Sequence, residues 1–170
     1  MTPFRIALGA TMLAAALITS AAAQPDPLGD TLYDAITGEE LRDFVESRGQ
    51  AVELLEDQDG DPLIAATTTD GFVFRINTYD CEQRGEVRAC GVLHYRVSFA
   101  DTGLSELDSL RAANEWNATR IHGRAFRVPD GRLELDMVMT LTRGTPSSAL
   151  AEAHAGFVTL IGEFAAGLAR

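Results

Sequence analysis

Hydrophobic and polar residues alternate along much of the chain between residues 51 and 141, which is the pattern of strands with one buried face. In Val92–Phe99, for example, the set that begins at Leu93 is apolar and is expected to face the core. We predict six strands, at residues 51–56, 63–69, 72–79, 92–99, 124–128 and 133–141. Short turns such as Asp70-Gly71 separate them, so we expect antiparallel pairing.

Three other segments carry apolar residues every three or four positions and predict helices. The first starts at Thr37, which forms a capping box with Glu40. The second starts at Ser105, and its predicted inner face carries Leu107, Leu110, Asn114, Asn117 and Ile121. The third follows Thr145-Pro146. The order α-β4-α-β2-α predicts an α+β fold, an antiparallel sheet with flanking helices on one face.

The N-terminus predicts export. Residues 1–23 have one early charge, then an apolar run, then Ala21-Ala22-Ala23, the pattern of a cleaved signal peptide. The run is shorter than the ~20 residues of a membrane span. We therefore expect a soluble periplasmic protein with no membrane contact after cleavage. Residues 24–36 are expected to be a linker or flexible arm, and residues 37–170 one domain.

Charge limits the classes of partner. The 170-residue chain has a formal net charge of −11, which disfavours binding to nucleic acids and to anionic membranes. It contains no lysine, which excludes lysine-based catalysis. Residues 111–143 are mildly basic by contrast. Either they complement the acidic part of the same chain or they form a docking patch for a partner.

The two cysteines, Cys81 and Cys90, are expected to form a disulfide in an exported protein. The bond would clip the loop between two predicted strands and contribute about 2.5–3 kcal/mol. A metal site built from both cysteines and His94 would lack a fourth ligand at a recognisable spacing. We expect no metal and no cofactor.

No catalytic arrangement stands out. Asp57-x-Asp59-x-Asp61 resembles the start of a calcium loop, but Pro62 occupies the place of the required glycine, so we expect an acidic turn. Glu134 and Asp136 share one face of a strand, an arrangement that paired catalytic carboxylates use, but that face is expected to be the solvated one. The three histidines, His94, His122 and His154, show no metal-binding spacing.

The least ordinary cluster is Asn114, Trp116 and Asn117. Tryptophan is favoured at binding hot spots, so the cluster is a candidate binding surface. Alternatively, Trp116 packs on the sheet while the two amides tie the helix to a neighbouring strand. Buried amides of this kind must be hydrogen-bonded.

Over about residues 38–168 the chain resembles the YbjN-domain proteins. The resemblance depends on the order of these elements, with Asn114-x-Trp116-Asn117 followed by a hairpin and then the Phe157–Phe164 helix. The resemblance implies a regulator of bacterial sensory transduction without established catalytic residues. It also implies a curved sheet similar to that of type III secretion chaperones, which are often dimeric.

Three functional hypotheses remain. The leading one is a periplasmic, non-enzymatic binding or regulatory module that contacts a protein partner or a second copy of itself. The alternative is a small-molecule carrier with a pocket between sheet and helices, near Trp116, Tyr95 and Phe126. A hydrolase is the third, and none of the usual nucleophile or metal arrangements supports it.

Overall fold

Three helices and nine strands make up the part of the chain that the computed structural model describes, residues 31–100, 102–141 and 144–169. The predicted signal peptide lies outside these residues. In chain order the elements are β1 (Leu32–Tyr33), β2 (Ile36–Thr37), α1 (Gly38–Ser47), β3 (Ala51–Glu56), β4 (Pro62–Thr67), β5 (Val73–Arg84), β6 (Val87–Phe99), α2 (Glu106–Thr119), β7 (Arg124–Arg127), β8 (Leu133–Thr140), β9 (Thr145–Pro146) and α3 (Ser147–Leu168). The fold is α+β, and three two-residue strands add to the predicted elements.

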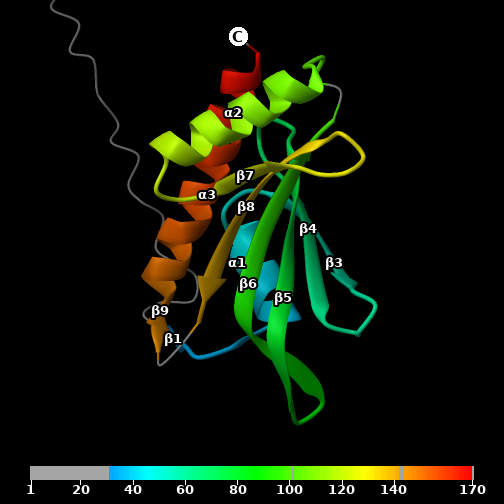
Figure 1. Ribbon diagram of the computed structural model, residues 1–170. Coiled ribbons are helices and arrows are strands. Elements are labelled where there is room, and N and C mark those ends of the chain that lie inside the picture. Colours follow the sequence, from blue (N-terminus) through cyan, green and yellow to red (C-terminus); the bar gives the residue numbers. More distant parts are fainter. Residues whose placement is uncertain (1–30, 101, 142–143, 170) are drawn as a thin grey trace, which may run out of the picture.

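One antiparallel sheet dominates the molecule, with the strand order β3-β4-β5-β6-β8-β7 (Figure 1). β2 pairs with β6 beyond the end of β8, and β1 pairs separately with β9. The long β5 and β6 form the centre of the sheet. β7 pairs with only the first half of β8, from Leu133 to Asp136, which leaves the second half of β8 at the edge.

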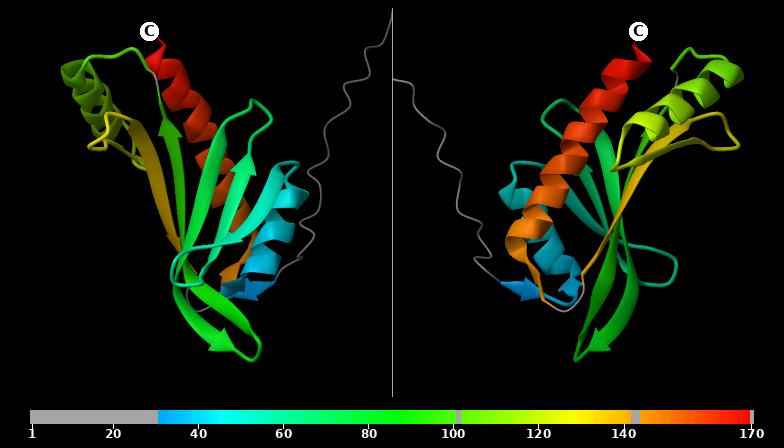
Figure 2. Two further views of the ribbon diagram at one scale, coloured as in Figure 1. Left: turned by 90° about the vertical axis from the view of Figure 1, so that its right-hand side faces the viewer. Right: turned by 60° about the vertical axis from the view of Figure 1, so that its left-hand side comes forward.

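The hydrophobic core lies between one face of this sheet and the helices α1 and α3 (Figure 2). The capping box of Thr37 and Glu40 starts α1 and is present as predicted. Alternate residues of β6 from Leu93 to Phe99 face the core, which confirms the predicted inner face. Aromatic contacts such as Tyr95 with Phe157 join the sheet to α3.

α2 lies at one end of the molecule, against β7 and α3, and the described residues place no helix over the other face of the central strands (Figure 2). Side chains from Arg75, Tyr79 and Val138 are exposed there. We call this surface the open face; it consists of the outward side chains of β3 to β8.

Residues 31–36 differ from the expected linker or flexible arm. They form β1 and β2, with Tyr33 4% exposed and Ile36 fully buried. Two-residue strands have too little periodicity to be recognised, because their positions depend on partners far along the chain. The remainder of the predicted arm lies outside the described residues.

The predicted inner face of α2 is wrong. Leu107, Leu110 and Ile121 are 56%, 43% and 95% exposed. The helix instead buries Ser109, Ala113 and Trp116. Two small side chains allow close approach of the helix, and the large indole ring supplies the buried area, so this narrower face is preferred over the leucines.

Candidate functional site

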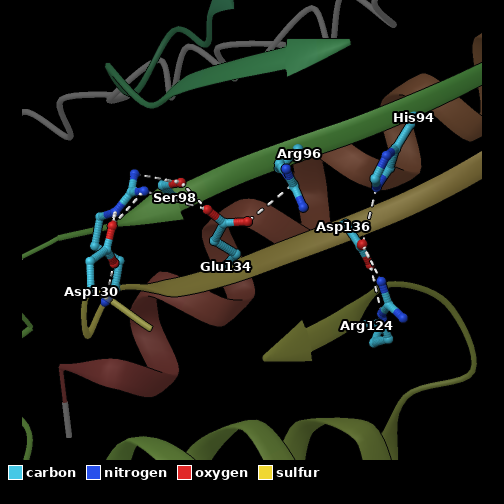
Figure 3. Close-up of polar contacts among 8 residues, drawn as sticks. His94, Arg96, Ser98, Arg124, Asp130, Glu134 and Asp136 are labelled. Carbon is cyan, nitrogen blue, oxygen red and sulfur yellow. Dashed lines mark hydrogen bonds and ion pairs between the residues drawn. The ribbon is translucent and has the colours of Figure 1, made fainter. Parts of the chain in front are cut away.

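Two carboxylates on the open side of β8 are almost completely buried. Glu134 is 5% exposed and Asp136 3% exposed, so the expectation of a solvated pair is wrong. Side chains from β6 and β7 fold over them, as Figure 3 shows. Buried charges require partners, and each of these carboxylates has several.

Asp136 binds Arg124 and His94 at once. Arg124 lies directly opposite it in the β7–β8 ladder and forms two contacts, Nη2 to Oδ2 at 2.6 Å and Nε to Oδ1 at 3.2 Å. Nε2 of His94 lies 3.0 Å from Oδ2. This bidentate contact is strong and directional. The hydrogen bond to Asp136 and its negative charge raise the pKa of the Arg124 guanidinium above its ordinary value.

Glu134 has an equivalent set of partners. Ser98 in β6 lies directly opposite Glu134 and donates its hydroxyl hydrogen to Oε1 at 3.0 Å. Nε of Arg96 forms an ion pair with Oε2 at 3.0 Å. Hydrogen bonds thus reach both oxygens of Asp136 and Oε1 of Glu134, whereas Oε2 of Glu134 has only the ion pair with Arg96 (Figure 3). Their role in this arrangement is to hold arginine side chains in place.

The arginines form a fixed surface over these carboxylates. Arg124 lies over the ring of Phe126 at 5.0 Å from its centroid, and Arg96 lies 5.9 Å from the same centroid. Such cation–π contacts restrain both guanidinium groups. The Arg124 side chain is nevertheless 69% exposed and that of Arg96 42% exposed, so both groups can bind a further partner.

A shallow hollow of about 640 Å³ adjoins this surface. Arg120, His122, Arg124 and Val138 are among its lining residues. On the same face of the sheet, toward β5, Arg75 lies opposite Arg96 in the β5–β6 ladder. Cationic side chains are thus gathered on one side of a protein whose total charge is strongly negative.

The sequence-predicted cluster divides between two roles. The Trp116 ring is 8% exposed, packs edge-on against Phe164 at 5.0 Å and donates Nε1–H to the Gly123 carbonyl at 3.1 Å. Asn117 bonds to both backbone groups of Ala125 at 2.8 Å each. Asn114 is exposed. These contacts are those of the packing interpretation for Trp116 and Asn117; a binding role for the cluster stays a prediction.

Cys81 and Cys90 are disulfide-bonded. They do not flank a loop, as the sequence suggested, because β5 and β6 continue beyond them and the two residues stand opposite each other in the ladder. Strand pairing therefore already holds the two cysteines together. The described residues contain no group of three or more histidine, cysteine, aspartate or glutamate side chains that could hold a metal ion.

The acidic segment from Asp57 to Asp61 is a hairpin turn. Oδ1 of Asp57 accepts the backbone N–H groups of Asp59 and Asp61, each at 2.9 Å. Asp61 also forms an ion pair with Arg88 at 2.7 Å. The carboxylates thus stabilise the turn, as the sequence interpretation expected.

The proposed carrier residues do not meet in one site. Tyr95 is fully buried on the core face, whereas Phe126 lies under arginines on the other side of the sheet. Trp116 packs at the end of the molecule against α3. Sequence reasoning missed the residues that form the arginine surface. They lie beside the acids of β8 only in the folded sheet, so the pairing can be recognised only when the strand register is known.

The fold and this surface define a small α+β domain with an antiparallel sheet, helices on one face and paired charges on the other. Residues 37–169 match the YbjN family, described as "Putative bacterial sensory transduction regulator". The chain belongs to this family, as the resemblance implied. No curated protein matches the chain. Among the described residues, no helix is both long and apolar enough to cross a membrane.

Proposed function

We propose that this protein is an exported, non-enzymatic regulatory module that acts by binding another protein through its open face. The observation that carries the proposal is the arginine surface, Arg96 and Arg124 fixed over Phe126 by two buried carboxylates. Membership of a regulator family supports a regulatory rather than a chemical role.

The composition of the open face supports protein contact. Arginine and tyrosine are enriched at binding hot spots, and Arg75 and Tyr79 are exposed beside the arginine surface. Arginines held in place lose little conformational entropy when a partner binds. An acidic partner surface would complement them, and because the whole chain has a net charge of −11, acidic surface elsewhere on the protein would favour the approach of such a partner at this face.

The same contacts favour a role without catalysis. A general base must reach a substrate proton, yet Glu134 and Asp136 are almost completely buried, and their carboxylates already contact arginine, serine and histidine side chains. The pair therefore supports a binding surface better than it supports chemistry.

Export is part of the proposal. The N-terminal pattern and a disulfide between the two cysteines both support an oxidising compartment such as the periplasm. N-terminal sequencing of the protein recovered from the periplasmic fraction tests this. The expected first residue is Gln24; an intact Met1 in the cytoplasmic fraction would contradict it.

Site-specific cross-linking tests the open face. A photoreactive benzoylphenylalanine at position 75, in the centre of the face, is expected to capture one discrete protein in the native host. The matched control places the same group at Arg111 on α2, which is 69% exposed and away from the open face. The second measurement adds Arg124→Ala or Tyr79→Ser to the position-75 protein, and each is expected to reduce the captured product.

The outcomes separate the alternatives. A product of twice the chain mass would identify a second copy as the partner, and a different mass would identify a regulatory target. Equal capture from positions 75 and 111, or capture that neither added substitution reduces, would contradict binding through the open face.

A further inference from the structure

The second half of β8 has an unpaired edge. β7 pairs only as far as Asp136, and no strand among the described residues lies beside Met137–Thr140 on that side. The N–H of Leu141 donates to the carbonyl of Gly91 in β6. Because backbone groups alternate in direction along a strand, those of Met139 also face β6 and those of Val138 and Thr140 face outward.

The neighbouring strand confirms this alternation. Ala125 in β7 has its backbone groups bonded to Asn117 on α2, so Arg124 and Phe126 on either side of it face β8. Asn117 thus closes the sheet edge at β7. Nothing equivalent occupies the outward backbone groups of Val138 and Thr140 in the described parts of the chain.

A groove of about 580 Å³ lies beside this edge, between β8 and α3. Its walls are mainly apolar and include Met137, Met139, Ala149, Ala153, Gly156 and Leu160. The α3 side presents alanine and glycine, which leave space for larger side chains from outside. An edge strand with free backbone groups next to an apolar groove is the arrangement used in recognition by strand addition.

We propose that this groove binds an extended segment of a partner protein, which adds to β8 as an antiparallel strand. The segment has apolar side chains at alternate positions, directed into the groove, and an acidic side chain at the end next to Arg124. The inference deepens the proposed function, on which it rests, because it names the part of the partner that is recognised.

The geometry sets the length and charge of the segment. Four residues of β8, Met137–Thr140, have no neighbouring strand on the outer side, which corresponds to about 13 Å of strand at ~3.3 Å per residue. β7 blocks further pairing at Asp136, so the end of the added strand meets the exposed Arg124 together with His122, which lines the groove. An acidic side chain complements that end.

A second copy of the chain is a weaker occupant. Each copy has a net charge of −11, so pairing two copies edge to edge brings like charges together. A segment of a different protein avoids this repulsion. Sedimentation of the mature protein distinguishes the two.

Two substitutions test the groove without removing a native contact. Gly156→Leu fills it: a Cβ at Gly156 would meet no atom within 4 Å, and leucine favours the helix more than glycine does. The matched control is Gly162→Leu in the same helix, where space is also open but no groove wall is formed. Val138→Pro removes the outward N–H, a change that edge strands tolerate, whereas Val138→Thr keeps it.

The probe is a phage-displayed library of random eight-residue peptides, selected on the mature protein. Recovered peptides are expected to alternate apolar residues and to carry an acid at one end. As synthetic peptides, they are expected to bind at least tenfold more weakly to Gly156→Leu and Val138→Pro than to the wild type. Gly162→Leu and Val138→Thr are expected to bind as the wild type does, and circular dichroism of each variant checks folding.

Three results would overturn the inference: a selection without recovered binders, binding that Gly156→Leu and Val138→Pro leave unchanged, or a dimer that Gly156→Leu dissociates. The proposed function is tested separately. If cross-linking from position 75 persists in the groove variants and the library yields no groove binders, the open face binds a partner and the groove does not. If position 75 gives no cross-link but peptides still bind to the groove, the groove binds a partner segment and the open face does not.

Discussion

The side-chain amide of Asn117 makes both hydrogen bonds with Ala125 that a neighbouring strand would make. Oδ1 accepts the Ala125 N–H and Nδ2 donates to the Ala125 carbonyl, each at 2.8 Å. An α-helical residue thus satisfies an edge strand, and the contact fixes α2 on β7. At Ala125 the edge of β7 is therefore occupied, whereas the second half of β8 has no such partner among the described residues.

Replacing Asn117 with alanine should destabilise the fold. Both backbone groups of Ala125, a residue 2% exposed, would lose their partners, so the free energy of unfolding should fall by about 1–3 kcal/mol. Urea unfolding measures the change. Asn114→Ala on the same helix is the control; that side chain is exposed, so a change within about 0.5 kcal/mol is expected. Equal effects of the two substitutions would contradict the assignment.

The sequence predicted what depends on near neighbours. β3 has the predicted bounds, Ala51–Glu56, and the caps of α1 and α2 form at Thr37 and Ser105. The inner face of β6 followed from alternation alone. These features depend on residues at most a few positions apart, so a single sequence contains their signal.

The candidate site could not be predicted in the same way. Burial of Asp136 depends on Arg124 and His94, which reach it only through the register of three strands. The inner face of α2 depends on how one indole ring fits against Phe164 on a distant helix. Local periodicity contains no information about such pairings, so the expected solvated acids and the expected leucine face were wrong.

His154 should make stability depend on pH. Its ring lies in the core, 5.4 Å from the centroid of Phe44, and Nε2 lies 2.8 Å from the Gln50 side-chain oxygen. Burial, with a smaller effect of the Arg48 charge, lowers the pKa of His154 to about 4. In the unfolded chain the ordinary value is about 6.5, so between pH 6.5 and 4 the unfolded state binds a proton that the folded state does not.

Above pH 6.5 this histidine should therefore not lower the free energy of unfolding. As the pH drops from 6.5 to 4, the free energy of unfolding should fall by about 3 kcal/mol. Carboxylates titrate in part of this range, so His154→Gln, which removes the titrating ring, is measured in parallel. The difference between the two proteins isolates the histidine. If that difference stays constant between pH 7 and pH 4, His154 is not held neutral by the fold.

Trp116 should contribute to stability through both its ring and its N–H. Trp116→Ala removes the contact with Phe164 and should cost about 3–5 kcal/mol. Trp116→Phe keeps a ring there but leaves the Gly123 carbonyl without its donor, so a loss of about 1–3 kcal/mol is expected. Far-ultraviolet circular dichroism follows urea unfolding, because the variants lack the only tryptophan. A stable Trp116→Ala protein that no longer binds its partner would instead support the binding interpretation.

The Cys81–Cys90 disulfide should add stability to a hairpin that is already paired. The two residues are opposite each other, and the ladder continues to Arg84 and Val87. In the chain-entropy description, a loop this short contributes about 2.5–3 kcal/mol, which reduction of the exported protein should remove. Urea unfolding with and without reductant measures this loss. The variant with alanine at both positions is the control, since reductant should not change it. Free thiols in the exported protein, denatured without reductant, would show that the bond does not form.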